Sequence, residues 1–164
     1  MKKKISILGS TGSIGESTLK IVIKDYKNIE INTLIANSNI KKIIQQIRKF
    51  KPRNFVITNV NVFNKLKLNY KFKKTKLFNN YEKIRDKNDL TVIAIPGLAS
   101  LKPTIHFIKK SKKILLANKE AIICGWDIIN SAAKKYKSTI IPIDSEHFSI
   151  AQLLKNHDHQ EVEK

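Results

Sequence analysis

The 164-residue sequence has few of the features that mark secreted, membrane or fibrous proteins. It holds one cysteine, Cys124, so no internal disulfide can form, which indicates a reducing, cytoplasmic location. Five glycines and four prolines are too few for a collagen-like or wholly disordered chain. No stretch reaches eighteen apolar residues, and the first residues lack the apolar segment of a signal peptide. With 41% hydrophobic residues, the chain can bury one core but is too short for two full-sized domains.

Arginine is also scarce, although the formal net charge is +19. Only three of the 32 basic residues are arginine, and the lysines are spread along the whole chain. Proteins that read nucleic acid depend on arginine for bidentate contacts to phosphate and guanine. Abundant lysine, isoleucine and asparagine together indicate a coding bias, with lysine at solvated positions. A basic nucleic-acid-binding module is therefore the less favoured alternative.

Short strand-like runs alternate with helical patterns of apolar residues. Strands are expected at residues 5–8, 29–36, 54–58, 90–95, 113–117 and 139–143, and helices at 13–26, 40–50, 103–110 and 121–136. The stretch 60–88 predicts only a short helix and a strand among lysine-rich loops. We place Ile14, Ile21 and Val22 on the apolar face of the first helix, and Trp126 and Cys124 in the core. This order is typical of a Rossmann-like α/β fold, a doubly wound parallel sheet with helices on both faces.

A glycine-rich turn, Gly-Ser-Thr-Gly-Ser-Ile-Gly at residues 9–15, follows the first strand and opens the first helix. Glycines at this spacing permit a tight turn, close approach of a pyrophosphate, and packing of helix on strand. The helix N-terminus offers unpaired N–H groups to the phosphates. The spacing is a variant of the commoner G-x-G-x-x-G. Its place in a βαβ unit favours a dinucleotide site over a turn without a ligand.

The residues after the second strand indicate which dinucleotide binds. NAD sites usually place Asp or Glu about twenty residues after the glycines, where it binds the ribose 2′-hydroxyl. This strand is followed by Asn37, Ser38 and Asn39, with Lys41 and Lys42 beyond and no carboxylate. Amide, hydroxyl and ammonium groups suit a 2′-phosphate, so NADP is favoured over NAD. Ordinary turn residues are the alternative.

Asn118, Lys119 and Glu120 follow a later strand, at the edge where open α/β sheets bind ligands. An amide, a cation and a carboxylate there predict a site that faces the crevice. The alternative is a helix start with exposed charges.

A pair of carboxylates follows the last predicted strand. Asp144 and Glu146 point to the same side of an extended segment, so their oxygens can converge on one hard cation. Mg²⁺ and Mn²⁺ prefer such oxygen ligands. A solvated acidic turn is the alternative, and a structural and a functional role are both open for His147.

Three of these segments together resemble a known family. GSTGSIG at 9–15, ILLANKEA at 114–121 and PIDSEH at 142–147 are similar to 1-deoxy-D-xylulose 5-phosphate reductoisomerases, and Ala-Ile-Pro-Gly at 94–97 extends the match. The resemblance runs from residue 1 to about 153. It implies an NADPH-dependent oxidoreductase that converts 1-deoxy-D-xylulose 5-phosphate, a sugar phosphate, to 2-C-methyl-D-erythritol 4-phosphate for isoprenoid precursors.

The resemblance also implies site residues. Those implied to bind NADPH are Thr11, Gly12, Ser13, Ile14, Asn37, Ser38, Asn39, Asn118 and Glu120. Lys119, Asp144 and Glu146 are implied to be catalytic, with Lys119 and Ser145 on the substrate and Asp144 and Glu146 on Mg²⁺ or Mn²⁺. Where this chain has Asn37-Ser38-Asn39, the family commonly has Gly-Lys-Asn. A lysine is therefore missing, although Ser38 and Asn39 can donate hydrogen bonds.

The resemblance finally predicts that this chain is a fragment. Family members continue well past residue 164 and supply a third metal carboxylate, phosphate-binding residues, a lid and a C-terminal helical domain. We predict a Rossmann-like NADPH-binding domain over 1–147 and the beginning of the catalytic domain over 148–164, inactive alone. Another NADP-dependent Rossmann dehydrogenase is the alternative function. No membrane or nucleic-acid partner is expected, and a homodimer of the full-length form is left open.

Overall fold

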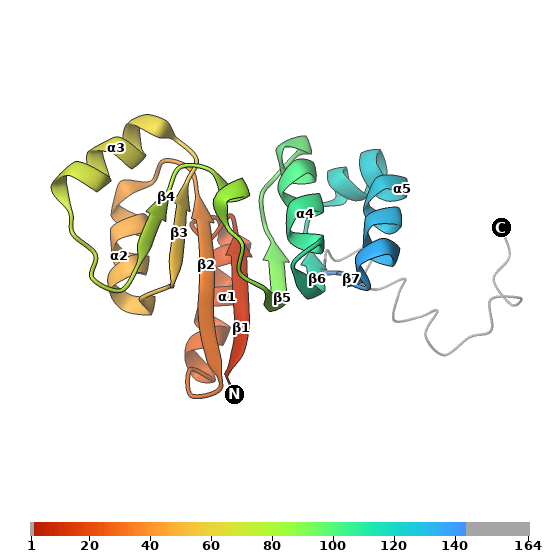
Figure 1. Ribbon diagram of the computed structural model, residues 1–164, viewed down its shortest axis with the longest axis horizontal. Coiled ribbons are helices and arrows are strands. Elements are labelled where there is room, and N and C mark those ends of the chain that lie inside the picture. The colour runs from red at the N-terminus through yellow and green to blue at the C-terminus, as the bar shows by residue number, and fades with distance from the viewer. Residues whose placement is uncertain (1, 144–164) are drawn as a thin grey trace, which may run out of the picture.

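A parallel sheet of seven strands runs through residues 2–143, the part of the chain that the computed structural model describes (Figure 1). The elements are β1 (Lys3–Leu8), α1 (Ser13–Lys24), β2 (Ile29–Ala36), α2 (Ile40–Phe50), β3 (Asn54–Ile57), α3 (Val60–Asn69), β4 (Lys76–Phe78), β5 (Asn88–Ile93), α4 (Leu101–Ile108), β6 (Ser111–Leu116), α5 (Lys119–Tyr136) and β7 (Thr139–Pro142). Two 3₁₀ turns, η1 (Tyr81–Lys83) and η2 (Leu98–Ser100), precede β5 and α4. The sheet confirms the predicted Rossmann-like, doubly wound α/β fold.

The strand order places the switch in winding direction beside β1. The order is β4-β3-β2-β1-β5-β6-β7, and every neighbouring pair is parallel. From β1 the chain builds outward to β4, then crosses back to place β5 on the other side of β1. The connections after β1 and β5 therefore leave the sheet in opposite directions. A crevice for ligands opens at such a point, at the carboxyl ends of the strands.

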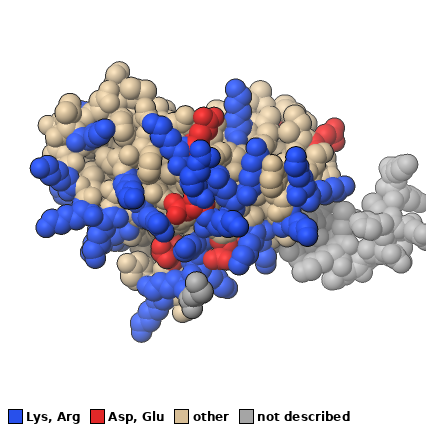
Figure 2. Space-filling view, viewed as in Figure 1, with Lys and Arg blue, Asp and Glu red and all other residues tan. Residues whose placement is uncertain are grey.

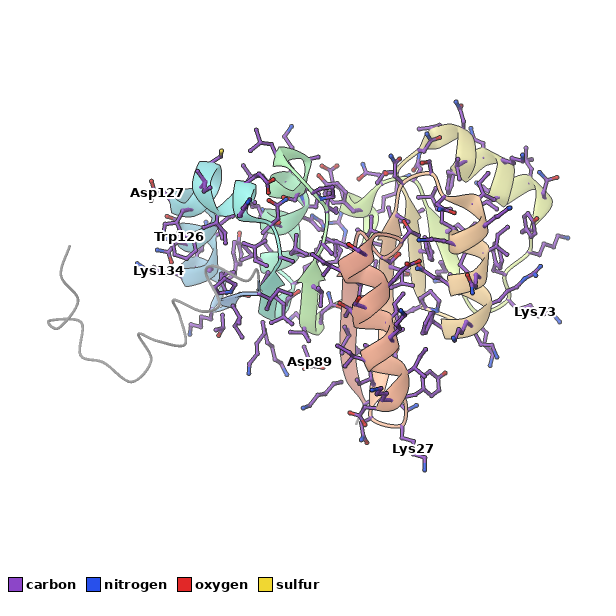
Figure 3. The ribbon with its side chains drawn as sticks, turned by 180° about the vertical axis from the view of Figure 1, so that it is seen from behind. Lys27, Lys73, Asp89, Trp126, Asp127 and Lys134 are labelled. Atoms are coloured by element: carbon purple, nitrogen blue, oxygen red, sulfur yellow. The ribbon has the colours of Figure 1, made fainter. Side chains whose placement is uncertain are left out.

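Helices cover both faces of the sheet, as Figures 1 and 3 show from opposite sides. Alternate side chains along the central strands pack into two separate hydrophobic cores, one on each face of the sheet. Leu34 and Phe55 pack with residues of α1 and α2, whereas their neighbours Ile35 and Val56 pack with residues of α4 and α5. Both faces are buried, and the carboxyl halves of two of these strands, residues 34–36 of β2 and 55–57 of β3, are continuous apolar runs.

The apolar face predicted for α1 is wrong at two positions. Ile14 and Ile21 are 42% and 68% exposed. The face of α1 that packs on the sheet consists of Gly15, Leu19 and Val22. Glycine brings the start of the helix close to the sheet, and this sets which side faces inward.

The core assignment of Trp126 and Cys124 is also wrong. Trp126 is 46% exposed and Cys124 is exposed, and Figure 3 shows Trp126 on the outer side of α5. The buried stripe of α5 is made mainly of small residues: Ala121, Gly125, Ile129 and Ala133. A Cβ on Gly125 would lie 2.5 Å from Leu101 Cδ1 of α4. Because close helix packing selects small residues at most buried positions, several large ones, Ile123, Trp126 and Ile128 among them, face outward.

All the predicted strands and helices are present, with boundaries that differ from the predicted ones by at most two residues. The stretch 60–88 contains α3 and β4. β5 begins earlier than expected, at the polar residue Asn88, whose Oδ1 accepts hydrogen bonds from Ser6 Oγ and Asn32 Nδ2 at 2.7 Å each. Within the described residues, no helix is long and apolar enough to cross a membrane. The predicted domain boundary at residue 147 lies outside them.

Candidate functional site

Two adjoining cavities lie at the carboxyl edge of the sheet, on either side of the turn after β1. The first, about 520 Å³, is bounded by this turn, the end of β2, η1 and the loop after β5. The second, about 400 Å³, extends from the start of α1 to the start of α5. Gly12 and residues 94–96 line both cavities. An elongated ligand that occupied both would cross the glycine turn at Gly12.

The three glycines of the turn have two different roles. Gly9 has φ +84°, and a Cβ there would collide with the carbonyl oxygen of Ala94. A Cβ on Gly15 would collide with the Gly9 carbonyl oxygen and lie 2.7 Å from Ser10 Cα. A Cβ on Gly12 would meet only the Gly9 carbonyl oxygen, at an ordinary 3.5 Å. Gly9 and Gly15 thus pack the turn, while Gly12 leaves its open side to the cavities.

The N-terminus of α1 is suited to an anion. Gly12 is the N-cap residue, and no side chain caps the helix there. The peptide N–H groups of the first turn and the positive end of the helix dipole therefore face the cavities beside Ser13 and Ile14. This arrangement fits a pyrophosphate.

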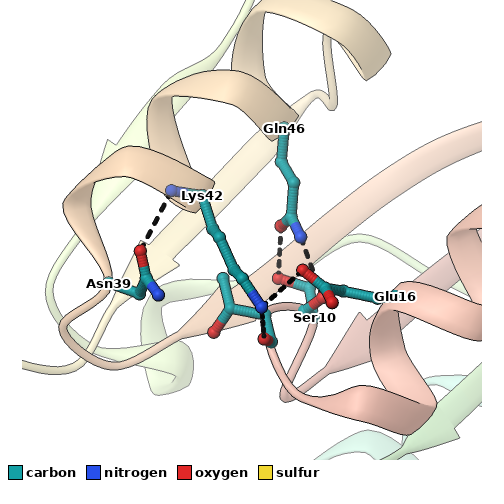
Figure 4. A network of polar contacts seen from close by, with 6 residues as sticks. Ser10, Glu16, Asn39, Lys42 and Gln46 are labelled. Atoms are coloured by element: carbon teal, nitrogen blue, oxygen red, sulfur yellow. Dashed lines mark hydrogen bonds and ion pairs between the residues drawn. The ribbon is translucent and has the colours of Figure 1, made fainter.

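Helix α2 holds the turn through Ser10. Ser10 Oγ donates to Gln46 Oε1 at 2.7 Å, and Gln46 Nε2 donates to the Ser10 carbonyl oxygen at 2.8 Å (Figure 4). Ser10 is fully buried and Gln46 nearly so. The pair satisfies both polar groups of Ser10 and fixes the turn relative to α2.

Of the two lysines after β2, only Lys42 reaches the turn. Its Nζ lies 2.7 Å from Glu16 Oε1 of α1 and donates to the Thr11 carbonyl oxygen at 3.2 Å (Figure 4). Lys41 lines a different cavity, on the far side of α2 with Tyr70. Helical spacing separates the two lysines, because successive residues point about 100° apart.

Asn37, Ser38 and Asn39, which connect β2 to α2, have different surroundings in the structure. Asn37 lines the 520 Å³ cavity, and its Oδ1 accepts from Thr58 Oγ1 at 3.2 Å. Asn39 is the N-cap of α2, where its Oδ1 accepts from the Lys42 peptide N–H at 3.1 Å. Ser38 and Asn39 do not line either cavity.

Asn118 is buried between the loop after β5 and the start of α5. Its Nδ2 donates to the carbonyl oxygens of Ile95 at 2.6 Å and Gly97 at 2.9 Å and to Ser100 Oγ at 3.0 Å. Its Oδ1 accepts from the Ala121 peptide N–H at 3.0 Å and caps α5. Asn118 also lines the smaller cavity, so its hydrogen bonds fix the position of the loop residues that form one wall of this cavity.

The smaller cavity brings several predicted site residues together. Gly12, Ser13 and Ile14 line one side of it, and Lys119 and Glu120, both exposed, line the other side. Asp144, Ser145, Glu146 and His147 lie outside the described residues. Within residues 2–143, no group of three His, Cys, Asp or Glu side chains is placed to hold a metal ion.

Tyr81 and Thr58 line the larger cavity, and sequence reasoning missed both. Burial raises the pKa of Tyr81, and the nearby charge of Glu82 raises it further, so its hydroxyl stays neutral. The ring of His106 packs edge-on to Tyr81, with centroids 5.5 Å apart. Tyr81 falls in the stretch whose apolar pattern was weakest, so the sequence carried no signal for it. Gln46 was missed too, since it reads as the polar side of a helix.

Lysine and arginine side chains are scattered over the visible face, most densely in its middle and lower part, with other residues between them (Figure 2). This distribution agrees with the spread of lysine along the sequence. Among residues 2–143, by contrast, none of those that line the larger cavity carries a charge.

Comparison with known proteins gives a consistent family. The family model described as 1-deoxy-D-xylulose 5-phosphate reductoisomerase matches residues 5–125. Proteins of that name from Pelagibacter ubique and Thermoanaerobacter pseudethanolicus are 46% and 37% identical, each over 99% of this chain and 43% of its own length. The chain thus spans less than half the length of these curated relatives.

Solved structures agree with the sequence matches. The reductoisomerase from Zymomonas mobilis in complex with NADPH superposes with a TM-score of 0.81 at 29% identity, over 89% of this chain and 40% of that one. A reductoisomerase structure with NADPH, fosmidomycin and magnesium gives a TM-score of 0.81 at 32% identity, over 92% and 38%. From the motifs, the fold and these matches together, the chain belongs to the 1-deoxy-D-xylulose 5-phosphate reductoisomerase family.

Proposed function

We propose that this chain is the NADPH-binding part of a reductoisomerase that converts 1-deoxy-D-xylulose 5-phosphate to 2-C-methyl-D-erythritol 4-phosphate. The observation that carries the proposal is the open side of Gly12, at the uncapped start of α1, where two cavities meet. A dinucleotide has this shape, with a pyrophosphate between two larger halves. NADPH-bound relatives with the same fold support this assignment.

The residues fit NADPH from one end to the other. Gly12 and the first turn of α1 would hold the pyrophosphate, with Thr11, Ser13 and Ile14 beside it in the cavity lining. The adenosine half occupies the larger cavity beside Asn37. The nicotinamide half occupies the smaller cavity, toward Asn118 and Glu120.

When bound, NADPH supplies the hydride for the reduction step. Lys119, at the start of α5 in the nicotinamide cavity, neutralises negative charge that develops on substrate oxygens. Asn118 keeps the cavity wall in place through its hydrogen bonds to the loop after β5.

The substrate and metal roles of the last site residues rest on the family resemblance. We propose that Ser145 contacts the sugar phosphate, and that Asp144 and Glu146 bind Mg²⁺ or Mn²⁺. Magnesium in related structures supports the metal assignment. We also propose that residues 1–147 form the NADPH-binding domain and that 148–164 begin the catalytic one. We propose that turnover requires this chain together with the part of the protein that the longer relatives have and this chain lacks.

Fluorescence titration of the 164-residue chain with NADPH and NADH tests the binding proposal. NADPH should bind more tightly, because no carboxylate follows β2. Gly12→Val should weaken both dinucleotides, since its side chain would occupy the pyrophosphate position. Ser17→Val, which introduces the same side chain at an exposed position of α1, is the control. Absence of binding, or a Gly12→Val variant that binds normally, would contradict the proposal.

Turnover is tested with a chimaera that joins this chain to the remainder of the Pelagibacter ubique relative. With 1-deoxy-D-xylulose 5-phosphate and Mn²⁺, the chimaera should oxidise NADPH, whereas the 164-residue chain alone should not. Asp144→Asn or Glu146→Gln should abolish turnover in the chimaera and leave its NADPH affinity nearly unchanged. Reduction of a semialdehyde in place of this substrate would favour the alternative dehydrogenase.

A further inference from the structure

The adenosine end of the site lacks a cation at the position after β2. Asn37 pairs with Thr58, Asn39 caps α2, and Ser38 between them is neutral. The 2′-phosphate of NADPH is a dianion or nearly so at neutral pH, and proteins commonly bind it with a cationic side chain. Among the described residues that line the two cavities, Lys119 is the one cation, and it lies at the nicotinamide end.

Lys42 is placed to supply the missing charge. Its Nζ is bonded to the carbonyl oxygen of Thr11, and Thr11 lines the adenosine cavity together with Asn37. Lys42 does not itself line this cavity, but its ammonium group lies beside the lining residue Thr11, between the glycine turn and the start of α2 (Figure 4). An ammonium has three N–H donors, and two contacts, to Glu16 and Thr11, account for two of them. The Lys42 side chain is 38% exposed, so a ligand can reach it.

Glu16 is the group with which a phosphate would compete. Its carboxylate, in the first turn of α1, holds Lys42 Nζ at 2.7 Å and is equally exposed. A half-exposed ion pair of this kind is weak, because water screens it. A phosphate that brings more negative charge can therefore draw the ammonium toward itself.

We propose that Lys42 binds the 2′-phosphate of NADPH and that its ion pair with Glu16 sets how strongly the site prefers NADPH to NADH. This inference rests on the proposed function, since it presumes that the two cavities bind a dinucleotide. A competing explanation is that Lys42 only positions the turn through Thr11. In that case, its loss would weaken both dinucleotides equally.

Substitution of Lys42 separates these explanations. Lys42→Met should weaken NADPH binding about tenfold to a hundredfold, the range for a lost charge-assisted hydrogen bond, and change NADH binding by less than about threefold. Lys41→Met is the matched control, with the same change in charge one residue away on the other side of α2. Lys42→Arg should retain the preference. Calorimetry with adenosine 2′,5′-bisphosphate and AMP isolates the 2′-phosphate from the rest of the dinucleotide.

Substitution of Glu16 tests the second half of the proposal. Glu16→Gln removes a charge near the pyrophosphate and should tighten both dinucleotides, with NADPH gaining more because Lys42 is released. The ratio of the two affinities should rise about threefold or more. In the double variant Glu16→Gln/Lys42→Met, this rise in the ratio should disappear.

Each outcome decides a different claim. Equal weakening of NADPH and NADH by Lys42→Met, or an equal loss of NADPH affinity in Lys41→Met, would overturn the role of Lys42 and leave the proposed function standing. Failure of the unaltered chain to bind either dinucleotide would overturn the proposed function, and this inference with it. Circular dichroism verifies that each variant is folded, and Lys42→Gln replaces Lys42→Met if the latter does not fold.

Discussion

The turn after β1 and the loop after β5 line the same cavities, but different chemistry holds each of them in place. The turn depends on two glycines whose missing side chains let it pack against the start of the loop after β5 and against α1. Polar side chains of α2 then hold it from outside. The loop after β5 depends on one buried side chain, Asn118, which reaches it from the next strand–helix connection. The first arrangement is damaged by added atoms and the second by removed ones.

The largest effect is expected from enlarging a packing glycine. In Gly15→Ala the new Cβ collides with the backbone of Gly9 and Ser10, which cannot move aside as a flexible side chain would. We expect a loss of about 3 kcal/mol or more in the free energy of unfolding, or failure to fold. Gly12→Ala, the control, should change it by less than about 1 kcal/mol. Urea denaturation measures both, and similar losses would show that the glycines do not differ in role.

Truncation of Asn118 should have the next largest effect. Asn118→Ala leaves the part-buried Ile95 carbonyl oxygen and the buried Ala121 N–H without this partner, whereas the Gly97 carbonyl oxygen keeps its hydrogen bonds from Ser100. We expect a loss of about 2–4 kcal/mol, as is usual for a buried cap with several hydrogen bonds. Asn39→Ala removes an exposed cap that makes one such bond and should cost about 1 kcal/mol or less. If thermal unfolding showed equal losses of stability for Asn118→Ala and Asn39→Ala, Asn118 would be no more than an ordinary helix cap, and the loop after β5 would not depend on it.

A smaller effect is expected at the contact between α2 and the glycine turn. Gln46→Ala leaves the hydroxyl and carbonyl groups of Ser10 buried without their partner and should cost about 1–2 kcal/mol. Gln45→Ala, at the exposed neighbouring position, should change the free energy of unfolding by less than about 0.5 kcal/mol. A Gln46 variant as stable as the Gln45 variant would show that the glycines alone hold the turn.

The smallest expected effect is a pH dependence of stability that arises from His106, which packs on Tyr81 beside the larger cavity. Burial lowers the pKa of His106 below 6.5, although its hydrogen bond to the Ile84 carbonyl opposes the shift. The unfolded chain therefore takes up a proton near pH 6.5, before the folded chain does, so stability falls as pH drops through this range. His106→Gln keeps a donor but removes the titration. On acidification from about pH 7.5 to about 5.5, the unaltered chain should lose more stability than the variant. Parallel pH profiles would contradict this.

Much of the architecture could be predicted from local sequence patterns. Apolar periodicity located every strand and helix outside residues 60–88, because each pattern reflects only which side of its own element is buried. It failed within α1 and α5. In both helices the buried face is set by how closely a glycine lets the helix approach its neighbour, at Gly15 and Gly125, and apolar periodicity does not report this.

The candidate site was predictable to the extent that it follows from motifs. The glycine turn and Asn118-Lys119-Glu120 were identified from their places after strands, and the structure brings them to one cavity. Tyr81 and Gln46 were not identified, because they reach the site from segments distant in sequence that lack a motif.

By itself, the sequence determined the α/β class, the order of the elements and the residue types at each strand end, since these depend on local spacing. Only the tertiary structure decided the order of the strands, the separate roles of the three glycines and the choice of Lys42 over Lys41 as the lysine at the turn. It also decided that the side-chain amide of Asn118 donates its hydrogen bonds to the loop after β5. The physical reason is that each of these depends on contacts between elements that are distant in the chain. How closely two backbones approach decides whether a side chain or a ligand has room between them, and local sequence patterns do not report this distance.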